Sequence, residues 1–210
     1  MDSAAGSAKS CRDPKIQAIL PLRGKVLNTH DKELADIIKN KEVKDIMIAL
    51  GTGVADQFTL HNLRYKQIII LADADSDGAH INCLILTLFI KHLPELIKKG
   101  KIYIAQPPLF KITSGSKKYY FYSPEELEQA TVKGEITRYK GIGEMNSEEL
   151  WETTMDPKKR KLIQLTTDNF DETLRIFETL MGNSSAARRD FIMSNNLMDA
   201  DDYFFGEDVE

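Results

Sequence analysis

Three carboxylates stand two residues apart directly after an apolar run. They are Asp73, Asp75 and Asp77, and the run before them spans residues 68–72. A continuous run rich in β-branched residues is typical of a central parallel strand buried on both faces, and such sheets bind ligands at the carboxyl ends of their strands. If the backbone stays extended, the three side chains point the same way and converge. Because clustered anions repel one another without a cation, and an all-oxygen ligand set favours Mg²⁺ or Mn²⁺ over zinc or copper, the sequence predicts a site for such an ion.

The acidic motif has three other interpretations. One is a solvated acidic turn closed by Gly78. An EF-hand calcium loop opens with the same pattern, but it needs a glutamate at its twelfth position and a helix before it, whereas this chain has Leu84 there and a predicted strand before it. A phosphotransferase with Asp73 as nucleophile and Asp75 as acid/base would also place two aspartates after an apolar strand, and this alternative stays open.

The hydrophobic pattern around the motif predicts a βαβ unit. We expect a strand over residues 66–72, a long helix over 80–99 and a returning strand over 101–105, joined by a right-handed crossover. Pro94 should bend the helix, and the prolines at 107–108 should end the second strand. The core face of the helix is predicted to comprise Ile81, Leu84, Ile85, Leu88 and Phe89.

Other elements are predicted on both sides of this unit. Helices are expected over residues 31–39, 43–50, 146–154 and 170–181, and strands over 119–122 and 135–139. Residues before about 28 are expected to form a loop, and Ser123 has the spacing of a helix cap. The buried stripe of the last helix is predicted to be Phe170, Leu174, Phe177 and Met181, with Gly182 as its stop. Gly141 and Gly143 would allow close approach of the backbone to a neighbour.

Six segments together resemble one family, the B subunit of bacterial type IIA DNA topoisomerases, which means DNA gyrase or topoisomerase IV. They are residues 2–9, 17–28, 73–81, 103–110, 138–146 and 150–155. The resemblance covers nearly the whole chain and implies an α/β TOPRIM fold, in which a small parallel sheet is flanked by helices, followed by a tail of short strands and helices. It implies a TOPRIM domain over residues 1–112, a tail over 113–197 that docks on the A subunit, and an acidic flexible tail over 198–210.

The start of the chain departs from the family pattern. The family motif opens Glu-Gly-Asp-Ser-Ala, whereas this chain opens Met1, Asp2, Ser3 and Ala4, so the motif glutamate is absent. We expect the chain to be a monomeric fragment of a longer protein, without a catalytic residue of its own, that binds metal weakly and is inactive alone. ATP binding and hydrolysis would belong to a region upstream of it.

The resemblance also implies a function and a set of partners. In the family, a tyrosine of the A subunit attacks a DNA phosphodiester, and the TOPRIM carboxylates hold Mg²⁺, for which Mn²⁺ or Ca²⁺ can substitute, against the scissile phosphate. Asp73 and Asp75 are the expected ligands, and Asp77 is either a second ligand or an outer anchor. The expected partners are the A subunit and double-stranded DNA, in an A2B2 complex. The alternative is a non-catalytic scaffold that recruits the A subunit and DNA.

Five residues are expected to contact DNA by the same resemblance. They are Arg23, Lys25, Asn28, His80 and Lys140, and Asp2 with Arg23 would border the pocket of quinolone-type drugs. Phosphate contacts by lysine and arginine position a duplex without reading its sequence.

Composition limits the remaining possibilities. A net charge of −4 and a pI near 5.7 indicate that any DNA-binding surface is local. The two cysteines give neither a zinc spacing nor a disulfide framework, which favours a reducing compartment and a cytoplasmic location. An apolar run of about 18 residues is missing, so we expect no contact with a membrane.

Overall fold

The computed structural model describes residues 2–195, with side chains from residue 4 onward, and divides into two compact units. The first unit comprises residues 2–21, 71–79 and 104–163, and the second comprises residues 22–70, 80–103 and 164–195. In this described part, no helix is long and apolar enough to cross a membrane. The predicted boundaries after residues 112 and 197 stay a prediction, and the predicted acidic tail lies outside the described residues.

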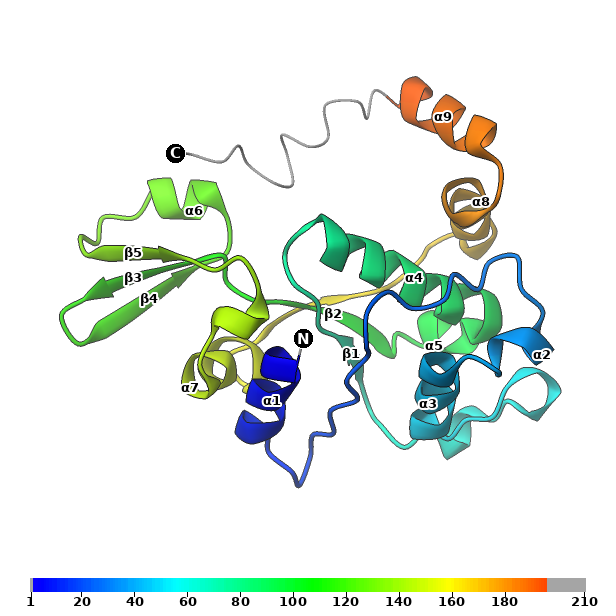
Figure 1. Cartoon of the computed structure of the whole chain (residues 1–210), viewed down its shortest axis with the longest axis horizontal. Helices are drawn as coiled ribbons and strands as arrows, with labels where there is room; N and C mark the ends of the chain where they lie inside the picture. Colours follow the sequence, from blue (N-terminus) through cyan, green and yellow to red (C-terminus); the bar gives the residue numbers. More distant parts are fainter. Residues whose placement is uncertain (1, 196–210) are drawn as a thin grey trace. The chain divides into compact units, whose positions relative to one another are not determined.

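The second unit is mainly helical (Figure 1). Its α-helices, including one that begins in the first unit, are α2 (Leu34–Ile37), α3 (Lys41–Leu50), α4 (Ser76–His92), α5 (Pro94–Lys98), α8 (Phe170–Met181) and α9 (Ser185–Ser194). Two short 3₁₀ turns, η1 (Ala55–Gln57) and η2 (Leu60–Asn62), follow α3. The helix α3 begins where the Asn40 side chain accepts a hydrogen bond from the Val43 amide, and it ends at Gly51, whose φ of 77° lies in the left-handed region.

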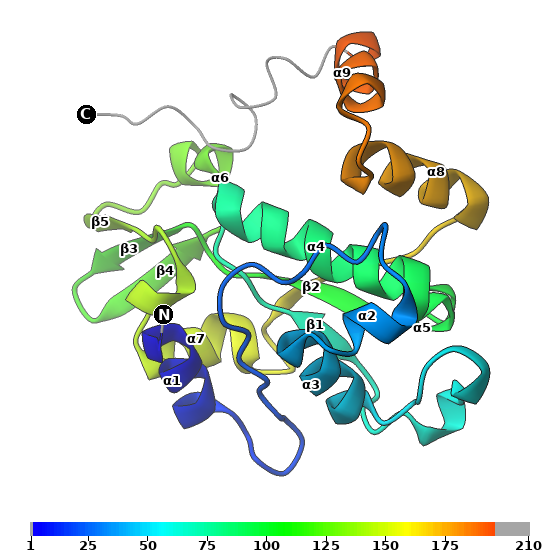
Figure 2. The ribbon, with the colours of Figure 1, turned by 45° about the vertical axis from the view of Figure 1, so that its right-hand side comes forward.

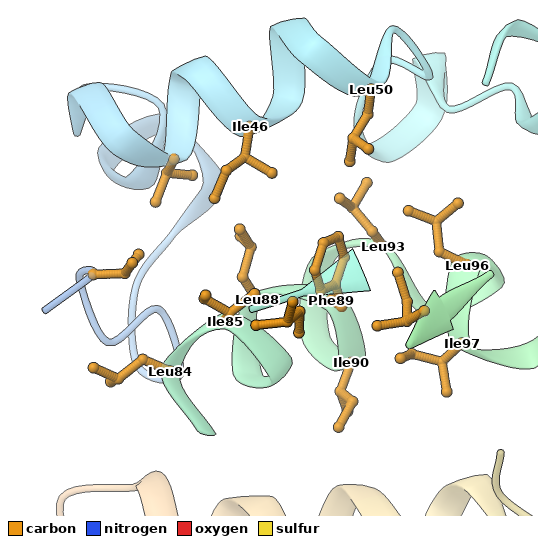
Figure 3. Close-up of a cluster of buried hydrophobic side chains, with 14 of the residues drawn as sticks. Ile46, Leu50, Leu84, Ile85, Leu88, Phe89, Ile90, Leu93, Leu96 and Ile97 are labelled. Carbon is orange, nitrogen blue, oxygen red and sulfur yellow. The ribbon is translucent and has the colours of Figure 1, made fainter. Parts of the chain in front are cut away.

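The core of the second unit lies between α3 and α4 (Figure 3). Ile46 and Leu50 point from α3 toward the side chains of α4 and α5, where Leu88, Phe89 and Leu96 are at most 1% exposed. The predicted face of α4 is confirmed, because four of its five residues are buried and Ile81 packs against them. The helix stops at His92 and α5 restarts at Pro94, as the proline predicted.

Three strands form one sheet in the order β1-β2-β6. They are β1 (Ile68–Ile70), β2 (Ile102–Gln106) and β6 (Lys161–Gln164). The predictions of the first two strands are confirmed, but β1 is not central as predicted, because it is at one end of this order and only Ile70 is fully buried. The apolar run correctly predicted that β1 contacts the core. Strand order depends on pairing with distant segments, so the run did not indicate which strand has neighbours on both sides.

The first unit contains an antiparallel sheet of order β4-β3-β5. Its strands are β3 (Phe110–Ser114), which was not predicted, β4 (Lys117–Phe121) and β5 (Glu135–Arg138). Its helical elements are α1 (Asp2–Cys11), α6 (Pro124–Glu128), η3 (Ile142–Glu144), α7 (Ser147–Leu150) and η4, a π-helix (Trp151–Met155). The predicted cap of α6 is confirmed by a 3.2 Å hydrogen bond from the Glu126 amide to Ser123 Oγ. Together the units are a mixed α/β structure with small sheets flanked by helices, which confirms the predicted fold class.

Two predictions about helices are wrong. Residues 2–11 form α1 instead of a loop, and Ala8 of this helix is buried against residues of the first unit. The helix α8 has the predicted bounds, but Leu174 of its predicted buried stripe is 36% exposed. The α8 helix and its neighbour α9, both in orange tones in Figure 2, carry no fully buried residue.

Candidate metal centre

The acidic motif bends into a helix in its second half. The backbone is irregular at Asp73, α4 begins at Ser76, and the Asp75 Oδ1 accepts a 2.7 Å hydrogen bond from the Gly78 amide. Asp75 therefore caps α4, and Asp77 lies in the first helical turn. The expectation of an extended backbone with three carboxylates on one face is wrong, because the capping bond of Asp75 turns the chain before Asp77.

Asp73 is held by a segment that lies far from it in sequence. Its Oδ1 accepts a 2.8 Å hydrogen bond from the backbone amide of Ile142. Next to that amide, a Cβ atom on Gly141 would lie 2.8 Å from both the Cγ and the Oδ1 of Asp73. The prediction that this glycine permits a close approach is confirmed, and the neighbour that approaches is the Asp73 carboxylate.

Gly78 makes the second close approach in the motif. A Cβ atom at this position would overlap the backbone carbonyl oxygen of Asp73, so no other residue type fits here without a shift of the backbone. The glycine therefore lets the first turn of α4 fold back against the residue that carries the first carboxylate.

The donor set fits a hard divalent cation. Asp73 and Asp75 are both exposed, and each has one oxygen fixed by a backbone amide, while a carboxylate can accept further bonds. Within residues 2–195, no group of three or more His, Cys, Asp or Glu side chains is placed to hold a metal ion. Mg²⁺ keeps several waters and often binds through one or two carboxylates together with substrate phosphates, so two aspartates satisfy its needs, whereas a zinc or EF-hand site needs more protein ligands.

Lys140 directly precedes the glycine that touches Asp73. Its backbone amide donates a 2.8 Å hydrogen bond to Glu144 Oε2, and the residue is exposed. The segment that carries Lys140 thus reaches the first carboxylate, whereas contact of the lysine itself with DNA stays a prediction.

The other predicted DNA-binding residues belong to the second unit. Arg23, Lys25 and Asn28 are exposed on an irregular segment that is anchored by the buried Val26 and Thr29. Both basic residues of this segment are thus exposed, and their contact with DNA stays a prediction.

Asn28 makes hydrogen bonds within the second unit, whereas His80 is exposed on a helix. The Asn28 side chain donates a 2.8 Å hydrogen bond to the carbonyl oxygen of Met181 and accepts one of 3.1 Å from the His30 amide, so it also ties this segment to the end of α8. His80 is exposed on α4. Asp2 of the predicted drug pocket lies in α1 of the first unit, with its side chain outside the described part, and the pocket stays a prediction.

An ion pair that the sequence did not indicate contacts both ends of the segment that holds Asp73, at Tyr139 and at Asn146. Lys111 Nζ is 2.9 Å from Glu149 Oε1, and Glu149 is 4% exposed. Burial alone would raise the pKa of Glu149, but the hydrogen bond and charge of Lys111, with contributions from Asn146 and Lys118, outweigh burial and lower it. Burial raises the pKa of Tyr139, and the negative charge of Glu149 adds to that shift.

Comparisons with known proteins cover both segments of this candidate site. The sequence profile of the Toprim domain matches residues 1–107, and the profile of the DNA gyrase B subunit, carboxyl terminus, matches residues 131–193. The first profile contains the acidic motif, and the second contains the segment that holds Asp73.

Named relatives match both parts at once. The DNA gyrase B subunit of Thermotoga maritima is 50% identical over 196 residues, and that of Archaeoglobus fulgidus is 48% identical over 198 residues. The DNA topoisomerase 4 B subunit of Mycoplasma capricolum is 50% identical over 199 residues. These matches cover 91%, 93% and 92% of this chain but only 31% of each relative, so the chain spans about a third of their length. Since the Toprim profile covers more than half of the sequence, the chain belongs to the Toprim domain family.

Proposed function

We propose that this chain is the Mg²⁺-binding part of a type II DNA topoisomerase, a gyrase or topoisomerase IV. The observation that carries the proposal is the fixed Asp73 carboxylate, held by the Ile142 amide in a chain whose relatives are named as B subunits of these enzymes. In this proposal the chain assists the cleavage and rejoining of double-stranded DNA by a tyrosine of the A subunit.

Asp73 and Asp75 would hold the cation, and Asp77 would bind a second one or stabilise the first from outside. Backbone amides occupy one oxygen of Asp73 and one oxygen of Asp75. Because both carboxylates are exposed, the second oxygen of each would bind a cation that also holds water and a phosphate. A bound Mg²⁺ would act as a Lewis acid on a phosphate oxygen, and Mn²⁺ or Ca²⁺ could take its place in binding. The aspartates themselves orient the site and neutralise the charge of the cation.

The partners follow from the proposed reaction. We infer an A subunit that supplies the nucleophile, double-stranded DNA, and an A2B2 assembly in the cytoplasm, where Cys11 and Cys83 would stay reduced. ATP binding and hydrolysis would be functions of the parent protein outside this chain. Phosphate contacts are assigned to Arg23, Lys25, Asn28, His80 and Lys140, and the quinolone-type pocket to Asp2 with Arg23.

The test uses a chain extended to the length of its relatives, so that it includes the motif glutamate. This protein is mixed with a bacterial topoisomerase A subunit, supercoiled DNA and Mg²⁺, and cleaved DNA is trapped with detergent. We expect double-strand breaks with covalently attached protein, and we expect Asp73→Asn to abolish them. Asp168→Asn, which changes an exposed aspartate outside the site, is the control.

The alternatives predict different results. If the extended chain with Asp73→Asn still supported full DNA cleavage, the result would favour a scaffold that plays no part in metal binding. Turnover of small phosphate monoesters without DNA or an A subunit would favour the phosphotransferase, in which Asp73 is the nucleophile.

A further inference from the structure

We propose that Lys111 and Glu149 are positioning residues for the Asp73 carboxylate, because they hold both ends of the segment 139–146 that carries the Ile142 amide. The inference rests on the proposed function, since it gives this pair a role at the proposed metal site. All residues in the argument belong to the first unit.

The segment between these ends is a compact turn. The amide of Glu144 donates a 3.1 Å hydrogen bond to the Gly141 carbonyl oxygen, and that of Met145 donates one of 3.3 Å to the Ile142 carbonyl oxygen. Ile142 is 8% exposed and Met145 is 2% exposed. These bonds and the burial link the residues of the turn to one another, so we expect the position of the Ile142 amide to depend on where the two ends are fixed.

The first end is fixed at Tyr139. Its backbone amide donates a 2.8 Å hydrogen bond to the Leu109 carbonyl oxygen, which ties it to the residue before β3. Lys111 Nζ lies 5.6 Å from the centre of the Tyr139 ring, within the range of a cation–π interaction.

The second end is fixed at Asn146 by Glu149. The Asn146 side chain accepts a 2.9 Å hydrogen bond from the Glu149 amide, and Glu149 Oε2 accepts one of 3.4 Å from the Asn146 amide. The other carboxylate oxygen of Glu149 accepts the 2.9 Å hydrogen bond from Lys111. The Lys111 ammonium group thus contacts the first end of the turn at Tyr139 directly and reaches the second end at Asn146 through Glu149. In this proposal, the linkage between the two ends sets the place at which Ile142 meets Asp73.

An ion pair that only stabilises the fold and one that positions Asp73 should respond differently to substitution. Replacing both members of a buried pair by apolar residues of similar size is often neutral for stability, whereas removing one member leaves a buried charge. The double variant Lys111→Met/Glu149→Met should therefore fold and keep the backbone bond from residue 149 to the Asn146 side chain, yet it lacks the carboxylate bond to the Asn146 amide and the cation near the Tyr139 ring. Fold stability and the position of Ile142 can be separated in this variant.

The experiment compares Lys111→Met/Glu149→Met with the unmodified chain of 210 residues. Protection of the Ile142 amide against hydrogen exchange is measured by NMR, and Mn²⁺ affinity is measured from the paramagnetic broadening of the signals around Asp73. We expect a loss of Ile142 protection and an affinity about 10-fold lower, the scale for groups that orient metal ligands. Lys118→Met is the control, because Lys118 lies 3.6 Å from Glu149 but makes no described contact with Tyr139, so both readouts should change little.

The outcomes separate the inference from the proposed function. Unchanged protection of Ile142 in the folded double variant would overturn the inference, and so would lost protection with unchanged Mn²⁺ affinity. The single variant Lys111→Arg, which keeps the positive charge next to Glu149, should retain most of the Ile142 protection and most of the Mn²⁺ affinity of the unmodified chain. Asp73→Asn judges the metal site itself: unchanged Mn²⁺ affinity in that variant would remove the proposed function, while the Ile142 measurement would still decide the positioning of the turn.

Discussion

The two units of this protein are stabilised in different ways. The buried interior of the second unit is a continuous set of aliphatic side chains with Phe89, spread over α3, α4, α5 and the neighbouring strands. The buried interior of the first unit is smaller, with Tyr139 and Met145 among its members, and the Lys111–Glu149 ion pair adjoins it. The second unit buries the larger apolar interior, whereas the Asp73 site of the first unit is held by polar contacts and close backbone approaches.

This difference bears on function. A site held by polar contacts has a defined geometry, because hydrogen bonds weaken with small changes of distance and angle. Asp73 takes its place from such contacts, so the metal site should respond to changes in the first unit that barely alter its stability. The following variants are designed to test that division.

The largest effect is expected in the apolar core of the second unit. Ile46→Ala should lower the free energy of unfolding by about 2–5 kcal/mol, because it removes a buried side chain and leaves a cavity. The matched control is Ile48→Ala on the same helix: Ile46 is 6% exposed but Ile48 is 57% exposed, so its change should stay within about 0.5 kcal/mol. Urea unfolding measures both, and equal effects would contradict the described packing of α3.

A glycine substitution tests the close approach in the first unit. Gly141→Ala should lower the free energy of unfolding by about 1–3 kcal/mol through overpacking, and it should weaken Mn²⁺ binding because its Cβ would displace the Asp73 carboxylate. Gly6→Ala is the control, since the space around Gly6 is open within 4 Å. In a helix this change should raise stability by about 0.5–1 kcal/mol. Calorimetry of metal binding would refute the argument if both variants bound Mn²⁺ equally.

In each unit an asparagine caps a helix. Asn40 caps α3 in the second unit, and Asn146 caps α7 in the first. Replacing either by alanine should cost about 1 kcal/mol of stability. Only Asn146→Ala should also lower Mn²⁺ affinity, because Asn146 ends the turn that carries Ile142. If Asn40→Ala weakened Mn²⁺ binding as much as Asn146→Ala did, the claim that the metal site depends on contacts of the first unit would be contradicted.

The last difference is confined to acid pH. The pKa of Glu149 is lowered in the folded protein from an ordinary value of 4.5, so its ionised form stabilises the fold fully above that value and loses this contribution as pH falls through the folded pKa. The stability advantage of the unmodified chain over Glu149→Gln should therefore be constant near pH 7 and shrink below about pH 4.5. Urea unfolding of both proteins at several pH values measures it, and a pH-independent difference would show that Glu149 titrates alike in the folded and unfolded states.

Much of the fold follows from local sequence. Apolar spacing predicted α3, α4 and α8, and the break at Pro94 and the end of α3 at Gly51 came from single residues with known backbone preferences. The helix α1 was missed because its small and polar residues show little periodicity, so it depends on packing within the first unit, where Ala8 is 3% exposed. Leu174 has the spacing of a buried residue, but the described helices and strands do not cover it.

The candidate site, like the fold, was predicted from the sequence only in part. The residue order alone indicated the carboxylates of the site, since Asp73 and Asp75 follow an apolar strand, and it marked Gly141 as a point of close approach. That Asp75 caps α4, that Asp77 lies within the helix, and that the Ile142 amide holds Asp73 became visible in the folded chain alone. The fold also paired Lys111 with Glu149, which are 38 positions apart. Residue types and short spacings record local backbone preferences, whereas a contact between distant segments depends on how the whole unit packs, which no short stretch of sequence specifies.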